Sequence, residues 1–321
     1  MSNSSSSSGP SAKQPTKPRR RSATQWAVAW RRFKRNKSGL LGFAIVIAFF
    51  IFAFVLPVLA SIRLPDGSHL ISLYPARSFE ALYQGQEGQP PSWQHPFGTE
   101  LAGIDVFSDS VWGARNDLYV GIAATLLATV IGIAVGAVAG YSKGIISASL
   151  LGIIQVFFVI PVLLLILLFA RVYSVLVFAG FGLTLIVLIL GFFGWSGIAF
   201  VVRGEIFRVK ELEFIQAEKA LGASNFRILF RHIVPNILTP VIVIASLSVA
   251  GNILTEVVIS FLGFGDPNTA TWGLLIQEGS TYVSTYWWVS FFPGLLVVLI
   301  VLGFNLLGDG LSDALNPRLR E

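Results

Sequence analysis

Residues 118–140 read LYVGIAATLLATVIGIAVGAVAG and contain no charged side chain. A helix needs about 20 predominantly apolar residues to cross the hydrocarbon core of a bilayer. Small residues also recur at every fourth position of this stretch, which lets another helix approach closely. They are Ala124, Ala128, Gly132, Gly136 and Gly140. The stretch therefore predicts a membrane-spanning helix that packs tightly against a neighbour.

Five further apolar runs have the same character, and they lie approximately at residues 39–61, 145–170, 181–202, 238–261 and 289–308. The composition agrees, because 54% of the 321 residues are hydrophobic and only 12% are charged, whereas soluble globular chains are about 25% charged. The sequence therefore predicts an all-α integral membrane protein with six transmembrane helices.

The first of these runs has a second interpretation, as the apolar part of a secretory signal peptide. Val58 and Ala60 give the small-residue spacing of a cleavage site. The apolar part of a signal peptide is only about 7–15 residues long, however, and usually lies close to the N-terminus. The length of residues 39–61 and the tail before them favour a retained transmembrane helix.

The distribution of lysine and arginine predicts the orientation, because basic residues near the ends of spans stay in the cytoplasm. Of the 23 lysines and arginines, 19 fall in one set of alternating segments, with ten in residues 1–38 and six in residues 203–236. Four fall in the opposite set. We therefore predict a multi-pass protein of the cell (plasma or inner) membrane with both termini in the cytoplasm. The net charge of +6 reflects this topology rather than nucleic-acid binding.

The segments outside the spans differ in composition. Residues 1–22 are rich in serine and too poor in apolar residues to fold alone, which predicts a disordered basic tail. Residues 23–38 place three aromatic residues on one helical face, which predicts an amphipathic helix at the inner membrane surface. A simple stop-transfer charge cluster is the alternative there. Residues 62–116 form a predicted external segment whose composition indicates no role.

Motifs for chemistry on this chain are missing from the sequence. It has no cysteine, its histidines His69, His95 and His232 are far apart, and it lacks the H-x-x-x-H spacing of metal sites and the G-x-S-x-G of hydrolases. It also lacks the G-x-x-x-x-G-K-[ST] loop that cradles nucleotide phosphates. We therefore expect no catalytic residue, metal or cofactor on this chain. Transport driven by ATP would require ATP and Mg²⁺ on a partner ATPase.

The fifth predicted span carries polar residues spaced four apart, namely Ser248, Asn252, Glu256 and Ser260. This spacing places them on one side of an apolar helix, and ionisable residues within spans often mark a substrate or ion pathway. At about 1.5 Å per residue, Glu256 lies roughly 27 Å from Leu238, near the outer surface, which disfavours a proton relay at the midplane. We predict that this polar stripe lines the translocation pathway. Interhelical hydrogen bonding without substrate contact is the alternative.

The inside segment at residues 203–236 predicts a pair of short helices. Apolar spacing predicts an amphipathic helix over residues 211–221 with its charged side outward, followed by a turn at Gly222. Ser224 is placed to cap a second helix, which we expect Pro235 to end. The predicted apolar faces are Phe214, Ala217 and Leu221 in the first helix and Phe226, Leu229, Phe230 and Ile233 in the second. Two helices fixed between spans form a rigid projection that suits the docking of a soluble partner.

The sequence of this segment is similar to that of a known family. Residues 216–224, QAEKALGAS, with RHIVPN at residues 231–236, resemble the EAA loop of ABC-importer permeases, in which a glycine and a downstream H-x-x-P recur. Three further stretches resemble the dipeptide/oligopeptide permease family in particular, and they are HPFGT at 95–99, SFLGFG at 260–265 and FNLLGDGL at 304–311. The basic segment before the first span is similar to that of the second of its two permease subunits. The resemblance covers about residues 27–319.

The resemblance implies the type I ABC importer permease fold, with a five-helix core at residues 117–308 and a cytoplasmic C-terminus at residues 309–321. It also implies four kinds of partner, namely a second homologous permease subunit, two ATP-binding subunits, an external substrate-binding protein and the lipid bilayer around the spans. It implies no nucleic-acid partner. The EAA loop would form the coupling helix that docks on the ATPase. The coupling residues so implied are Glu213, Gln216, Ala217, Glu218, Gly222 and Ser224.

Five residues depart from the family pattern, and two of them are Asp109 in place of a basic residue and Gln155 in place of an aspartate common in the third span. Gln216 replaces the leading glutamate of the EAA motif, Glu218 stands where a small residue is usual, and Ile104 replaces an arginine. These departures leave the class intact and weaken an inherited substrate. Peptides are the implied substrate, and oligosaccharides, nickel or another solute are the alternatives.

Other classes of protein fit the sequence less well. An ion-gradient-driven secondary transporter usually shows paired midplane carboxylates or an inverted repeat of broken spans, which this sequence lacks. A membrane enzyme lacks its catalytic residues here. A DNA-reading helix-turn-helix at residues 209–235 is disfavoured because both ends are anchored in the bilayer and three glutamates would repel phosphate.

Overall fold

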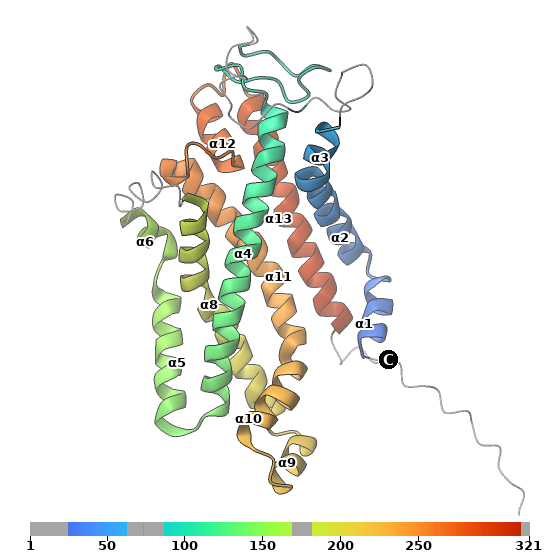
Figure 1. Ribbon diagram of the computed structural model, residues 1–321, viewed down its shortest axis with the longest axis vertical. Helices are drawn as coiled ribbons and strands as arrows, with labels where there is room; N and C mark the ends of the chain where they lie inside the picture. The colour runs from blue at the N-terminus through green and yellow to red at the C-terminus, as the bar shows by residue number, and fades with distance from the viewer. Residues whose placement is uncertain (1–24, 63–72, 74–86, 169–181, 316–321) are drawn as a thin grey trace, which may run out of the picture.

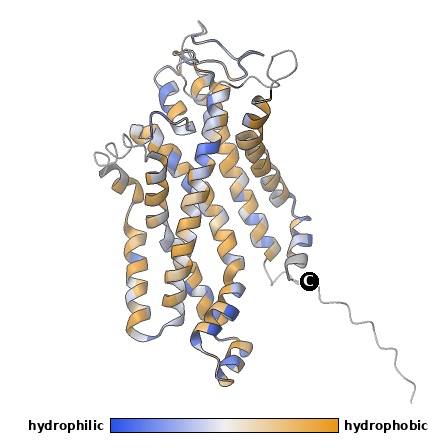
Figure 2. Ribbon diagram, viewed as in Figure 1, coloured by the Kyte–Doolittle hydropathy of each residue, from blue (hydrophilic) through white to orange (hydrophobic). Residues whose placement is uncertain are grey.

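The computed structural model describes residues 25–62, 73, 87–168 and 182–315. In these residues it is a bundle of helices joined by turns and loops (Figure 1). The predicted disordered tail, residues 1–22, and part of the predicted external segment lie outside the described residues. Figure 2 shows that the long helices are mostly hydrophobic along their length, as membrane-spanning helices are.

Five helical segments of the described residues are long and apolar enough to cross a membrane, namely Lys37–Ala60, Val106–Tyr141 (α4), Gly182–Val209 (α8), Asn225–Phe264 and Trp288–Leu315 (α13). The first of them consists of α2 (Lys37–Phe50), a π-helical turn η1 (Ile51–Val55) and α3 (Leu56–Ala60). These segments coincide with five of the six predicted spans, and they confirm an all-α membrane fold.

The remaining predicted span, residues 145–170, is divided in the structure. Its first part is α5 (Gly144–Val159), which is shorter than the other spans, and its second part is α6 (Val162–Leu168). Pro161 separates them, because a proline lacks a backbone N–H and disfavours helical geometry in the residue before it. Ile160 accordingly has extended backbone angles. The last two residues of the predicted span lie outside the described residues.

The second span begins earlier than the sequence predicts. The helix α4 starts at Val106 instead of residue 118, and Asp105 caps it by accepting a hydrogen bond from the backbone N–H of Ser108 at 2.7 Å. Residues 106–116, which were predicted to lie in the external segment, therefore form the first turns of this helix. Aspartate and arginine side chains in these turns ended the apolar run in the sequence.

The small-residue ridge of α4 packs against α8, as its spacing predicts. A Cβ atom built on Gly136 would lie 2.6 Å from the carbonyl oxygen of Ala199, and one on Gly132 would lie 2.8 Å from Cβ of Ile198. Both distances are too short for a side chain. Glycine at these positions is therefore what allows the two backbones to approach so closely.

The C-terminal helix α13 holds the N-terminal part of the chain in place. It packs against α2 and also against α1 (Gln25–Phe33), which covers most of the predicted interfacial helix. Phe33 is buried, and Asn36 donates a hydrogen bond from Nδ2 to Oδ2 of Asp313 at 2.9 Å. The same asparagine caps α2 by accepting from the backbone N–H of Gly39. The segment before the first span is therefore attached to the helical bundle.

The fifth span is continuous with the second short helix of the inside segment. Residues 225–264 form one helical segment made of α10 (Asn225–Arg227), η3 (Ile228–Ile233), α11 (Val234–Ile259) and η4 (Ser260–Phe264). The prediction that Pro235 ends the second helix is therefore wrong. Pro235 is the second residue of α11, its fixed φ suits a helix, and the helical segment continues from η3 through it.

Candidate functional site

The inside segment forms a projection at the end of the bundle (Figure 1). It consists of α9 (Glu213–Ala220), α10 and η3, which together cover residues 213–233. It lies at the opposite end from the short helix α12 (Trp272–Ser280). Hydrophilic residues gather around α9 and α10 (Figure 2). The structure thus places the segment where the sequence predicts a docking element.

Buried isoleucines attach the projection to the bundle. Ile215 in α9 and both Ile228 and Ile233 in η3 are fully buried. They share one apolar cluster with Ile206 and Val209 at the end of α8. Fully burying a side chain of this size contributes about 1.5–3 kcal/mol. The projection therefore has an apolar anchor of its own.

Polar contacts fix the projection further. Tyr141, the last residue of α4, donates from its hydroxyl to Oδ1 of Asn225 at 2.7 Å. Gln216 donates from Nε2 to the backbone carbonyl of Lys210 at 2.9 Å. His232 and Glu218 approach to 3.8 Å between Nε2 and Oε1, which joins η3 to α9. These contacts tie the two short helices to each other and to α4 and α8.

The turn between the two short helices has the geometry that the sequence predicts. Gly222 has a φ of 80°, which residues with a side chain rarely adopt. The backbone N–H of Ala223 bonds back to the carbonyl of Glu218 at 3.1 Å, which closes the end of α9. Ser224 then caps α10 by accepting from the backbone N–H of Arg227 at 3.4 Å. The predicted turn at Gly222 and the predicted cap at Ser224 are confirmed, and the role of both residues in coupling stays a prediction.

The apolar faces of the projection differ from those predicted. Leu229 and Ile233 face the bundle, but Phe226 is 72% exposed and Phe230 also lies on the surface, with its ring 4.5 Å from that of Phe226. The π-helical geometry of η3 changes the angular spacing of side chains, so a regular 3.6-residue period does not hold through it. The predicted second face is therefore only half buried.

In α9 the charged residues Glu213 and Lys219 are exposed, as predicted, but the predicted apolar face points outward beside them. Ile215 alone is buried in this helix, whereas Leu221, just after it, is 83% exposed. Five exposed apolar residues of the projection form what we call the apolar tip, namely Phe214, Ala217, Leu221, Phe226 and Phe230. Of the predicted coupling residues, Glu213, Gln216, Ala217, Gly222 and Ser224 are exposed and Glu218 is half-buried.

The polar stripe of α11 faces α4 for much of its length. Asn252 donates from Nδ2 to Oγ1 of Thr125 at 2.9 Å, and Thr125 in turn donates to the carbonyl of Gly121. Ser248 donates to the carbonyl of Ile244 in its own helix. The bond of Asn252 is of the kind that the interhelical alternative expects. The assignment of the stripe to a translocation pathway stays a prediction.

Glu256 is fully buried and lies beside a second carboxyl group. Its Oε1 accepts from Oγ of Ser260 at 2.6 Å, and Ser260 is itself fully buried. Asp117 of α4, also fully buried, lies within hydrogen-bonding reach of Glu256.

Trp272 at the start of α12 closes over this carboxyl pair. Its backbone N–H donates to Oδ2 of Asp117 at 3.1 Å, and its indole Nε1 donates to the carbonyl of Ser110 at 3.0 Å. Gly113 gives the indole room, because a Cβ there would lie 3.2 Å from the ring. The outer end of the stripe is therefore packed among α4, α11 and α12.

Asp117 is the residue of this site that the sequence did not reveal. It directly precedes residues 118–140, so it lies outside the span that the apolar run predicts. The structure places it inside the long helix α4 and turned toward Glu256. Its position seven residues after Ser110, on the face that carries Gly113, was the only available signal.

The stretch HPFGT at residues 95–99 has a structural role in the described fold. Nδ1 of His95 lies 2.7 Å from Oδ2 of Asp105, the residue that caps α4. The indole Nε1 of Trp288 donates to the carbonyl of Thr99 at 3.1 Å. A Cβ on Gly98 would lie 2.6 Å from the same indole nitrogen, so this turn requires glycine. The stretch joins the start of α4 to the start of α13.

Two protein families match different parts of this chain. A family described as "Binding-protein-dependent transport system inner membrane component" matches residues 132–321, and one described as "N-terminal TM domain of oligopeptide transport permease C" matches residues 24–71. The first range contains the whole projection and α11.

Several relatives are similar over nearly their whole length. A dipeptide transport system permease protein of Bacillus subtilis is 38% identical over 295 residues, which cover 91% of this chain and 86% of that protein. An oligopeptide transport system permease protein of the same organism is 32% identical, with 94% and 92% covered. A glutathione transport system permease protein of Pectobacterium atrosepticum is 33% identical, with 93% of each chain covered.

Proposed function

Because the chain belongs to the family of binding-protein-dependent transport system inner membrane components, we propose that it is the permease subunit of an ABC importer for peptides. Two separate ATP-binding subunits bind ATP and Mg²⁺ and hydrolyse the nucleotide. A second homologous permease subunit completes the membrane pathway, and an external substrate-binding protein delivers the peptide. Peptides are favoured because relatives are named as dipeptide, oligopeptide and glutathione permeases.

The observation that carries this proposal is the apolar tip. Its large side chains stand exposed on a segment whose own core is filled by Ile215, Ile228 and Ile233. Exposed apolar groups clustered beside charged ones mark a surface that binds another protein. The tip also lies outside the bundle, beyond the ends of α4 and α8 (Figure 1). It therefore suits a groove on a soluble ATPase.

The contacts of the projection suit the transmission of movement. An element that couples two proteins must move as a unit, and this one is fixed by an apolar anchor and by the bonds of Tyr141, Gln216 and His232. Displacement of the tip would therefore displace α8 and α11 directly. Reorientation of these helices against α4 gives alternating access to the two sides of the membrane.

The orientation in this proposal puts the projection and both termini in the cytoplasm. Basic residues are concentrated in and beside the projection, and basic residues near span ends stay inside. The segment 87–105 and α12 then lie outside, where the substrate-binding protein docks. Glu256 and Asp117 lie near that outer end, and Ser248 and Asn252 lie deeper along the proposed pathway.

The decisive experiment measures ATPase recovery with variants of the apolar tip. The full chain is tagged, co-expressed with the other subunits of its transporter, and purified from membranes. Leu221→Asn and Phe226→Asn should each lower the amount of ATPase recovered per permease by about tenfold or more, because burying such a side chain contributes about 1.5–3 kcal/mol. Both residues are exposed, so the fold should persist.

Leu221→Met is the matched control, because it keeps an apolar side chain of similar volume at the same position. It should recover as much ATPase as the unchanged chain. Equal recovery with Leu221→Asn and Leu221→Met, at equal membrane abundance, would refute the proposed coupling surface. Uptake of an oligosaccharide without any uptake of labelled tripeptides would instead refute the proposed substrate.

A further inference from the structure

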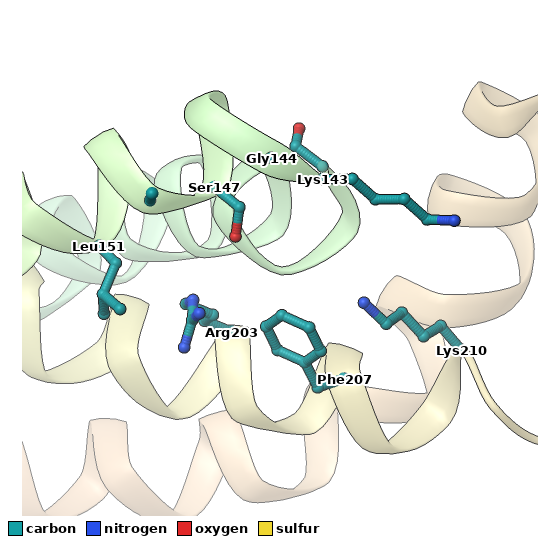
Figure 3. Close-up of a pocket in the computed structure, with 9 residues that line it drawn as sticks. Lys143, Gly144, Ser147, Leu151, Arg203, Phe207 and Lys210 are labelled. Atoms are coloured by element: carbon teal, nitrogen blue, oxygen red, sulfur yellow. The ribbon is translucent and has the colours of Figure 1, made fainter.

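A cavity of about 370 Å³ lies between the turn that joins α4 to α5 and the last turns of α8. Figure 3 shows side chains from the two sides of this cavity facing each other. The residues that matter here are Ser142, Lys143 and Ser147 on one side and Arg203, Phe207 and Lys210 on the other. None of the residues proposed for coupling to the ATPase lines this cavity.

The lining of the cavity is strongly basic. Three of its nine described lining residues are cations, namely Lys143, Arg203 and Lys210, and none of the nine is acidic. Nε of Arg203 is buried and has no hydrogen-bond partner among the described residues. A buried donor of this kind is costly unless something accepts its hydrogen bond. The cavity therefore offers cationic donors to an anion.

The cations are close enough to affect one another. The guanidinium carbon of Arg203 lies 4.7 Å from the ring centre of Phe207, and Nζ of Lys210 lies 3.6 Å from it, so both charges use the same ring. Removal from water lowers the pKa of Lys210, and the like charges of Lys143 and Arg203 lower it further, against the opposite effect of Glu211. A bound anion would relieve this repulsion.

The position of the cavity indicates what kind of anion it holds. The apolar helix α5 begins at Gly144, and directly beside Lys143 stand Ile145, 81% exposed, and Ile146, also exposed. The cavity thus lies at the boundary between an apolar outer surface and the polar end of the bundle. Lipid headgroups occupy this boundary, and basic pockets between helices on the cytoplasmic side suit anionic headgroups.

We propose that the cavity between α5 and α8 binds the phosphate of an anionic phospholipid from the inner leaflet. Arg203 and Lys143 bind the phosphate oxygens, and Lys210, which also lines the cavity, adds positive charge while its Nζ donates to the carbonyl of Gly140 at 3.2 Å. The acyl chains lie along the exposed apolar side of α5. The inner-leaflet assignment rests on the orientation proposed above, whereas lipid binding does not depend on the transported substrate.

Native mass spectrometry of the intact transporter complex tests the proposal. The complex is reconstituted in phosphatidylcholine bilayers that contain a minor fraction of phosphatidylglycerol, and the phosphatidylglycerol molecules that remain bound after release are counted. Lys143→Gln and Arg203→Gln should each lower retained phosphatidylglycerol about fivefold, as expected for one basic residue at a lipid surface. Arg203→Lys should retain most of it.

Arg208→Gln is the matched control. Arg208 lies near the same end of α8 and loses the same charge, but it pairs with Glu205 at 2.6 Å and does not line the cavity. It should leave retention unchanged. Equal loss with Arg208→Gln, or no loss with Lys143→Gln, would overturn the proposal, and Lys143 is exposed enough for this variant to fold. Displacement of the lipid by inorganic phosphate alone would assign the cavity to a soluble anion and overturn the lipid source.

Discussion

Substitution of Gly222 tests the coupling function at a single backbone position. Gly222 has a φ of 80°, and a Cβ built on it meets nothing within 4 Å. The substitution Gly222→Ala therefore introduces no clash, and its whole effect comes from the backbone. A left-handed conformation costs a residue with a side chain about 1–2 kcal/mol, or roughly five- to thirtyfold in the equilibrium between this turn and others.

A change in this turn should separate ATP hydrolysis from transport. The turn sets the direction in which Leu221 and Phe226 project, so a misdirected tip engages the ATPase poorly. We expect Gly222→Ala to lower the peptide transported per ATP hydrolysed by about fivefold or more, from the backbone cost above. Gly222→Val should lower it further, because a β-branched side chain tolerates a positive φ least. Gly222→Asn should retain most of it, because asparagine adopts this conformation readily.

The assay uses the complete transporter in liposomes. Its binding protein and the labelled peptide are placed on the side from which the peptide is taken up. Peptide uptake and phosphate release are measured on the same vesicles. Gly263→Ala is the control, because Gly263 has a φ of 83° with equally open surroundings but lies in η4, outside the projection. Unchanged coupling in Gly222→Val, or equal loss with Asn and Val, would refute the reasoning.

Three further substitutions test the packing and the polar stripe. Gly136→Ala should lower the free energy of unfolding by about 1–3 kcal/mol, and with it the membrane abundance, because α4 and α8 would be forced apart. Gly197→Ala is the control and should lower neither, because the space around Gly197 is open. Asp117→Leu should destabilise the fold by about 1–3 kcal/mol because the N–H of Trp272 loses its acceptor, and Asp117→Asn should be milder; equal melting temperatures would contradict this. Asn252→Ala should lower uptake without lowering membrane abundance, and parallel losses would favour a purely interhelical role.

The parts of the fold that could be predicted from the sequence depend on local geometry. Small residues at every fourth position define a face of a helix whatever surrounds it, and α8 was found packed on that face of α4. The turn at Gly222 and the cap at Ser224 are likewise set by a few neighbouring residues. These features need no knowledge of the rest of the molecule.

The start of α4 could not be predicted, because hydropathy treats a charged residue as a boundary. Arg115 and Asp117 interrupt the apolar run, yet the helix continues through both. Asp117 is accommodated by the backbone N–H of Trp272 and by Glu256, which lie far away in the sequence. A burial that depends on distant partners leaves no local signal.

The direction of the apolar faces in the projection could not be predicted for a different reason. An apolar side chain in α9 is expected to be buried, but the sequence does not show whether it packs against the bundle or against another protein. Ile215 is covered by the bundle and Phe214 is not, although they are neighbours in the sequence. The π-helical turn η3 adds a second uncertainty, because it breaks the regular period before α11.

The helical segment at residues 225–264 connects Phe226 of the apolar tip directly to Glu256 of the buried carboxyl pair. Phe226 and Glu256 are 30 residues apart in it, or roughly 45 Å at about 1.5 Å per residue. If this part pivots as a rod, a tilt of about 5° moves one of the two residues by about 4 Å relative to the other. A displacement of Phe226 is then transmitted to Glu256 without passing through any loop. It also reaches Trp272, which covers the carboxyl pair.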